Sequence, residues 1–265
     1  MLKDITLGQY FPGDSLLHRA DPRVKIILTL LYMVVVFLVK TYMGFLIITL
    51  FTLLAVVSSN VPVRYTLKGL KPVVAIVVFA AAINIFTTAG TPIFEIGFLR
   101  VTYEGVSLAV KMALRLSLLI VGASLLTLTT TPILLTDGIE KLMEPLRVIG
   151  VPAHEIAMMM TIALRFIPTL LEETDKIMKA QAARGADFDT GNLMQRAKSF
   201  IPVLVPLFIS AFRRAEELAT AMEARCYRGS VGRTRMKQLK LTKVDLEITI
   251  IMVVLIAAIL YLEYM

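Results

Sequence analysis

The sequence is poor in the residues that build metal and redox sites. It has one cysteine, Cys226, and two histidines, His18 and His154. A single cysteine excludes a disulfide bond within the chain. Because cysteine and histidine form no cluster, a tetrahedral metal site lacks its usual ligands. We therefore predict that the protein has no metal site and needs no cofactor.

The sequence also lacks the patterns of the common catalytic sites. It has no glycine-rich phosphate loop ending in Lys-Ser or Lys-Thr, so we predict that the chain does not itself hydrolyse ATP. No serine, histidine and aspartate stand in a convincing catalytic context. No acidic pair lies inside an apolar run, where proton relays usually have one. These absences predict a protein that is not an enzyme.

Charged residues are also scarce in the sequence. Charged residues make up 18% of the 265 residues, hydrophobic residues make up 57%, and mean hydropathy is +0.77. This apolar share exceeds that of ordinary soluble domains. Inside a bilayer the backbone polar groups must pair within the chain, and helices satisfy this requirement. The composition therefore predicts an all-α integral membrane protein.

Five apolar runs come close to the length that crosses a bilayer, roughly 17–25 residues. The first begins after Asp21-Pro22, a pair that favours a helix start because Asp caps the helix and Pro suits its first position. We predict five transmembrane helices from these runs. They cover residues 26–39, 43–58, 73–88, 105–129 and 246–262.

Basic residues indicate which loops stay in the cytoplasm. The net charge is +8, and lysine and arginine gather within residues 19–25, 64–71 and 228–243. The positive-inside rule then places the N-terminus in the cytoplasm and the C-terminus outside the cell. The stretch 228–243 has no acidic residue and no interleaved aromatic residue. We expect it to bind anionic lipid and not nucleic acid.

The segment between the fourth and fifth runs is too long for a loop. Its patterns predict three amphipathic helices over 132–147, 152–184 and 199–225, which we interpret as a module at the cytoplasmic face. The chain then divides into an N-terminal part with four transmembrane helices, this module, and a C-terminal transmembrane helix. The corresponding ranges are 1–131, 132–243 and 244–265.

Another interpretation of the module stays open. Residues 156–171 and 199–212 are apolar enough to suggest two more transmembrane helices, which would make a secondary transporter with Arg165 or Lys111 in its substrate path. Charged residues interrupt the first of these segments, and an isolated charge at the bilayer centre costs roughly 2.5–3.5 kcal/mol. Lys111 and Arg115 share a helix face and could instead reach the outer interface.

Two helical patterns end in similar tips, Ala183-Arg184-Gly185 and Ala224-Arg225-Cys226. Arginine carries a permanent charge and a planar set of donors, which suit the carboxylates and carbonyls of a partner's groove. The simpler interpretation is an arginine favoured by the helix dipole, with Gly185 and Gly229 ending the helices. Because the tip occurs twice, at equivalent helix ends, we favour a docking role.

The two tips, the five apolar runs and the N-terminal block of residues 8–25 together resemble the transmembrane T component of energy-coupling factor transporters. The resemblance covers essentially the whole chain. It implies a membrane subunit that joins two ABC-type ATPase subunits to a small membrane subunit that binds a vitamin or metal. It also implies crossed helices whose tips dock in the ATPases. Cys226 departs from the pattern, in which glycine would fit better.

Methionines suggest where the substrate-binding subunit docks. Met158, Met159 and Met160 are consecutive, and methionine repacks easily against different partners. They could equally be ordinary apolar filler. Together with Phe208 and Phe212 on the following helix, we predict that they form the docking face for the substrate-binding subunit. The sequence does not identify the vitamin or metal.

Overall fold

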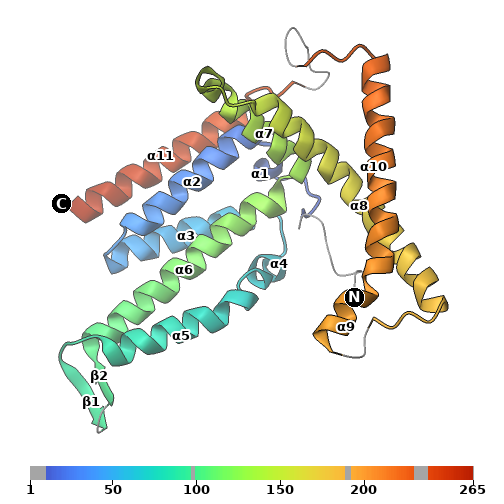
Figure 1. Ribbon diagram of the computed structural model, residues 1–265. Helices are drawn as coiled ribbons and strands as arrows, with labels where there is room; N and C mark the ends of the chain where they lie inside the picture. The colour runs from blue at the N-terminus through green and yellow to red at the C-terminus, as the bar shows by residue number, and fades with distance from the viewer. Residues whose placement is uncertain (1–9, 97–98, 189–191, 230–237, 265) are drawn as a thin grey trace. The chain divides into compact units, whose positions relative to one another are not determined.

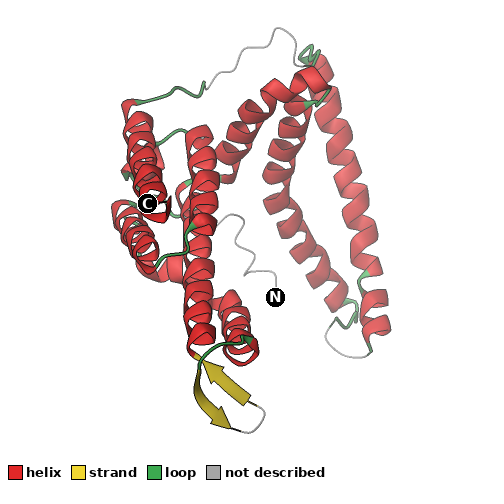
Figure 2. Ribbon diagram, turned by 90° about the vertical axis from the view of Figure 1, so that its left-hand side faces the viewer, coloured by secondary structure: helices red, strands yellow, loops and turns green. Residues whose placement is uncertain are grey.

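The computed structural model describes residues 10–96, 99–188, 192–229 and 238–264 (Figures 1 and 2). By its internal contacts the chain forms two compact units. The large unit comprises Gly8–Gly138 and Lys237–Met265, and the small unit comprises Met1–Leu7 and Ile139–Met236. Each unit is described by itself.

The large unit is built from long apolar helices that match the predicted runs. All five predicted runs fall on helices, and the helices extend up to four residues beyond them at the N-terminal end, where capping residues such as Asp21 and Thr41 lie. The short helices α1 and α4 were not predicted. The helices are α1 (Leu16–Arg19), α2 (Pro22–Leu38), α3 (Tyr42–Ser58), α4 (Val63–Lys68), α5 (Lys71–Thr87), α6 (Tyr103–Thr129) and α11 (Lys243–Tyr264).

A two-stranded hairpin, which was not predicted, adds to the mainly helical fold. Strands β1 (Pro92–Ile96) and β2 (Leu99–Thr102) pair antiparallel in the connection between α5 and α6. Figure 2 shows the pair as the yellow element beyond the ends of these helices. Isoleucine, phenylalanine and valine in this connection favour strands. The two strands pair their backbone groups with each other.

The core of the large unit lies where α2, α3, α6 and α11 meet. Tyr32 of α2 hydrogen-bonds Thr52 of α3 and donates to the Leu118 carbonyl of α6. Gly122 lets the Tyr32 ring lie against α6, because a Cβ at this position would overlap the ring. The most deeply buried side chains around this contact are Val36, Val39, Phe45, Ile48 and Ile259.

Among the residues that the structure describes, three helices are long and apolar enough to cross a membrane by length and composition. They are Tyr103–Thr129, Ala153–Ala183 and Lys243–Glu263, and Tyr42–Ser58 and Lys71–Thr87 are shorter apolar helices. The second of the three, α8, is one that we expected to lie at the interface. The predicted number of membrane crossings therefore stays a prediction.

The small unit contains the predicted amphipathic helices. Helix α7 (Pro132–Met143) starts in the large unit and is followed by the 3₁₀ helix η2 (Glu144–Ile149). Helices α8 (Ala153–Ala183) and α10 (Ile201–Ala224) agree with the predicted ranges within two residues at each end. The short helix α9 (Leu193–Ser199) between them was not predicted, and an Asn192–Gln195 capping box starts it.

Candidate functional site on two crossed helices

Helices α8 and α10 pack against each other in opposite directions. Glu173 of α8 accepts a hydrogen bond from Ser210 and an ion-pair hydrogen bond of 2.8 Å from Arg214, both on α10. Further along α8, Gln181 donates to the Pro202 carbonyl of α10. The residue numbers of the contacts therefore rise along α8 and fall along α10. The two helices are antiparallel and end at opposite sides of their contact (Figure 1).

The Glu173–Arg214 ion pair lies equally far from both tips. Glu173 stands eleven positions before Arg184 (184 minus 173), and Arg214 stands eleven positions before Arg225 (225 minus 214). At about 1.5 Å per residue, each helix extends roughly 16 Å from this ion pair to its tip arginine. The two helices therefore have arms of equal length between this ion pair and their tip arginines.

The tip of α8 is a Schellman motif, a helix end closed by two backbone hydrogen bonds. Gly185 donates to the Ala182 carbonyl and Ala186 donates to the Gln181 carbonyl, each at 3.0 Å. Gly185 has φ +90°, in the left-handed region that glycine enters at low cost. Arg184 is the C-cap, the last residue before this reversal.

The tip of α10 repeats this motif bond for bond. Cys226 donates to the Glu223 carbonyl at 2.8 Å and Tyr227 donates to the Met222 carbonyl at 3.0 Å. Arg225 is the C-cap, and Cys226 takes the left-handed conformation with φ +55°. The helix thus ends at Ala224, and the chain reverses at Cys226 and not at Gly229, the stop that the simpler interpretation of the sequence named.

Both tips are exposed along their full length. Ala183, Arg184 and Gly185 are exposed, and so are Ala224, Arg225 and Cys226. Within the described part of the chain, neither tip guanidinium has a hydrogen bond or an ion pair. Two permanent charges, each presented by the same backbone motif, are therefore available to a binding partner.

The predicted docking face is divided between the two helices. Phe208 and Phe212 are 62% and 67% exposed and lie one turn apart on α10. Ser210 stands between them in the sequence, so the two phenylalanines lie on the opposite face of the helix from Ser210. Met159 and Met160 are exposed near the start of α8, and Met158 is partly buried. The phenylalanines therefore lie at the level of the crossing, whereas the methionines lie near the start of α8.

Contacts between helices were missing from the sequence interpretation. The contact between Glu173 and Arg214 was not predicted from the sequence. The signal that could have found their contact is their spacing of 41 residues, which equals the spacing of the two tip arginines. A second missed pair is His154 of α8 with Glu140 of α7, at 3.0 Å.

The N-terminal block forms a polar network at the helix ends of the large unit. The Lys25 ammonium is buried and donates to the carbonyls of His18 and Thr129 and to the Thr130 hydroxyl, which joins α2 to the end of α6. Asp245 of α11 accepts the backbone N–H of Asp21. The block is therefore explained by packing within this unit.

Asp21 combines a helix cap with an ion pair. It accepts hydrogen bonds from the backbone and the guanidinium of Arg23, the latter at 2.8 Å. Burial by itself would raise the pKa of the Asp21 carboxyl, but the hydrogen bonds from Arg23 hold the pKa below its usual value of 3.8. The carboxylate therefore stays charged at neutral pH.

The positions of Lys111 and Arg115 favour a structural role over a substrate path. The Lys111 ammonium lies 4.6 Å from the centre of the Tyr42 ring. The Arg115 guanidinium donates to the Val39 carbonyl, the C-cap of α2, and lies over the Phe45 ring. Both side chains thus attach α6 to the connection between α2 and α3.

Comparisons with known proteins identify relatives that match the chain over most of its length. The family model described as "Cobalt transport protein" (CbiQ) matches residues 13–237. A protein from Ruminiclostridium cellulolyticum is 67% identical over 264 residues, which cover 100% of this chain and 99% of its own. A relative from Clostridium kluyveri is 62% identical, and the match covers 92% of this chain and 92% of the relative. A relative from Bacillus subtilis is 48% identical, and the match covers 99% of this chain and 100% of the relative.

All three relatives carry the name "Energy-coupling factor transporter transmembrane protein EcfT". The matches include both tips, both crossed helices and most of the N-terminal block. The identity extends over the whole length of the chain and is not confined to its apolar runs. The chain therefore belongs to the CbiQ family, as a transmembrane component of energy-coupling factor transporters.

Proposed function

We propose that this chain transmits ATP-driven motion from two cytoplasmic ABC-type ATPase subunits to a small membrane subunit that binds a vitamin or metal. The observation that carries the proposal is the pair of matching tips on crossed helices. Each tip presents one unpaired guanidinium on the same Schellman motif, eleven residues from a common contact. Such a pair suits two partners with similar grooves.

Arg184 and Arg225 are the proposed ATPase-docking residues, each flanked by small residues that allow close approach. The flanking residues are Ala183, Gly185, Ala224 and Cys226. Acidic groups and backbone carbonyls in an ATPase groove would bind the two guanidinium groups.

The charge pattern supports an orientation with the crossed helices at the cytoplasmic face. The amphipathic helix α8 carries Glu155, Arg165, Glu172 and Glu173, which a bilayer interior would penalise. We place the N-terminus in the cytoplasm, the C-terminus outside, and five helices across the membrane. The basic stretch 228–243 then lies beside anionic lipid of the inner leaflet.

Charge reversal at the tips tests the proposal. Arg184→Glu or Arg225→Glu alone should abolish uptake while a partial complex survives, because the other tip keeps the ATPases tethered. Each reversal should cost about 2–5 kcal/mol at a desolvated contact. The double variant should insert in the membrane but lose both ATPases on co-purification.

The matched control changes the same net charge elsewhere on the same helices. Lys176 and Arg213 are exposed and lie away from the tips. A Lys176→Glu/Arg213→Glu variant should keep both ATPases. Normal uptake and normal ATPase binding in the double tip variant would refute the coupling role.

The exposed side chains of the docking face give a second test. Phe208→Glu or Met159→Glu should release the substrate-binding subunit and keep the ATPases, because the new carboxylate would be buried without a partner. Met158, Met160 and Phe212 belong to the same proposed face. Loss of the ATPases together with the substrate-binding subunit would instead indicate damage to the crossed helices.

A further inference from the structure

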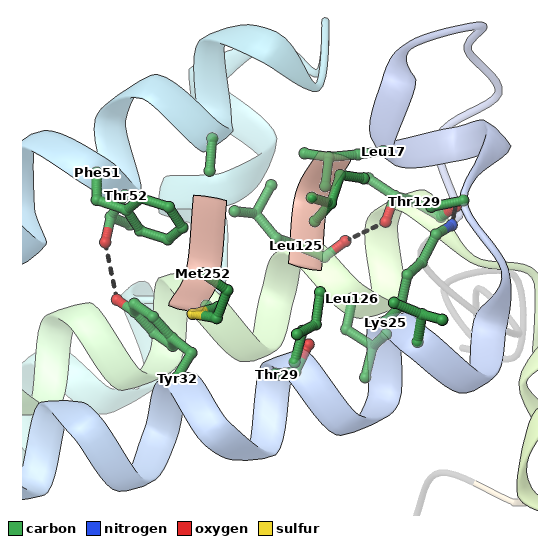
Figure 3. A pocket seen from close by; sticks show the side chains of 16 residues that line it. Leu17, Lys25, Thr29, Tyr32, Phe51, Thr52, Leu125, Leu126, Thr129 and Met252 are labelled. Atoms are coloured by element: carbon green, nitrogen blue, oxygen red, sulfur yellow. Dashed lines mark hydrogen bonds between the residues drawn. The ribbon is translucent and has the colours of Figure 1, made fainter. Parts of the chain in front are cut away.

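An apolar pocket of about 100 Å³ opens among α2, α3, α6 and α11 of the large unit. Its polar side chains are confined to a few places (Figure 3). Lys25 and Thr129 lie at one end, and Tyr32 and Thr52 lie at the other. Thr29 and the apolar side chains of Leu125, Leu126 and Met252 lie between them, and Phe51 and Ala55 also belong to the lining.

All but one of the polar side chains that line the pocket have used their donors within the chain. The Lys25 ammonium has three N–H donors and three acceptors at 3.1–3.3 Å. The Thr52 and Thr129 hydroxyls donate to the Ile48 and Leu125 carbonyls. The Tyr32 hydroxyl donates its one proton to the Leu118 carbonyl and lies 2.8 Å from the Thr52 oxygen.

Water is therefore a poor occupant of this pocket. An ordered buried water needs roughly two to four polar partners. Among the lining residues that the structure describes, Thr29 has the one hydroxyl without a hydrogen bond. The volume is also far larger than a single water needs, and apolar cavities of comparable size stay dry and take up hydrocarbon.

We propose that the pocket binds an acyl chain of a membrane lipid. It is open on one side, and the helices that form it belong to a membrane protein. Neighbouring positions on α3, such as Leu53, Leu54 and Val57, are apolar and exposed, which suits contact with lipid. An acyl chain entering from the bilayer would fill the apolar space and restore the packing that an empty cavity loses.

Recognition rests on the chain and not on the lipid headgroup. Lys25 is the one charged residue in the lining, and its donors are used. A phosphate would have to displace the His18 and Thr129 carbonyls from it. Occupancy should therefore be the same for zwitterionic and anionic lipids.

Photolabelling with a lipid tests the proposal. The full-length chain is reconstituted in phosphatidylcholine vesicles that contain a phosphatidylcholine with a photoreactive diazirine on its acyl chain. After irradiation, mass spectrometry of peptides locates the label. We expect enrichment on Phe51, Leu126 and Met252 over exposed positions of the same helices, and the same enrichment in phosphatidylglycerol vesicles.

Filling the pocket should remove the enrichment. Ala55→Leu places three more carbon atoms in the space and should lower labelling of the lining about fivefold, which corresponds to a modest loss of binding free energy. Leu126→Phe fills it independently from α6. The matched control Val57→Leu enlarges a side chain that is 68% exposed on the same helix and should leave the labelling unchanged.

Three outcomes would overturn the proposal. One is uniform labelling of the apolar surface in the unmodified chain, which would indicate an empty cavity. Another is enrichment that persists in both filled variants while the labelling of exposed positions shows that they are folded. The third is enrichment in phosphatidylglycerol vesicles alone, which would assign the binding to a headgroup.

Discussion

Cys226 occupies a backbone position that normally belongs to glycine. Its φ of +55° is left-handed, and the equivalent residue of the other tip is Gly185 at +90°. A residue with a side chain pays roughly 1–2 kcal/mol in this conformation. The backbone hydrogen bonds of the Schellman motif hold it there. Cysteine in place of glycine at this position therefore has a local energetic cost, although the hydrogen bonds of the Schellman motif are kept.

Substitutions at the two left-handed positions, Gly185 and Cys226, test this energetic cost. Cys226→Gly should stabilise the end of α10 by about 1 kcal/mol, and Gly185→Cys should destabilise the end of α8 by a similar amount. Hydrogen exchange of the Tyr227 amide, which closes the motif, should slow about fivefold in Cys226→Gly. Unchanged exchange at both tips would show that strain at this position is negligible.

The helices were predictable because each has a strong local signal. Apolar length and capping residues locate α3, α5, α6 and α11, and amphipathic periodicity locates α8 and α10. The short helix α4 has no side-chain cap, and α9 has only its capping box, and a helix of six or seven residues depends on tertiary contacts. The hairpin between α5 and α6 was missed for a similar reason.

The candidate site was predictable only in its parts. The tip arginines stand out in the sequence because a short pattern repeats. Their relation in space depends on the contact between Glu173 and Arg214, which joins residues far apart in the chain. Single helical patterns do not encode which faces meet, so the antiparallel crossing had to come from the structure.

The contact at the crossing gives a prediction for the helix pair. A double-mutant cycle with Glu173→Gln and Arg214→Met should give a coupling energy of about 0.5–1.5 kcal/mol, because both side chains are partly exposed. If the proposed function holds, Glu173→Gln should reduce uptake while both ATPases stay bound. Asp175→Asn is the control, since Asp175 makes only a 4.0 Å pair with Lys179 on the same helix. Equal uptake in all variants would show that the contact between α8 and α10 is not needed for transport.

At the scale of the whole molecule, labelling of cysteines from outside the cell separates five membrane crossings from seven. Ala197 and Ala89 are both exposed. In a Cys226→Ser background, Ala197→Cys should react with an impermeant thiol reagent only after the membrane is opened. Ala89→Cys, between α5 and the hairpin, should react in intact cells. Reaction of Ala197→Cys in intact cells would favour the secondary transporter with seven helices.

The equal arms of the crossed helices have a consequence for symmetry. An approximate twofold axis passes through the contact of Glu173 with Arg214 and exchanges Arg184 with Arg225. If the proposed function holds, a single chain presents itself to two similar partners in nearly the same way, as a dimer would. The axis is only approximate, because glutamate faces arginine and α8 is longer than α10. A scissor motion about this axis would move both tips by equal amounts, so neither partner could advance without the other.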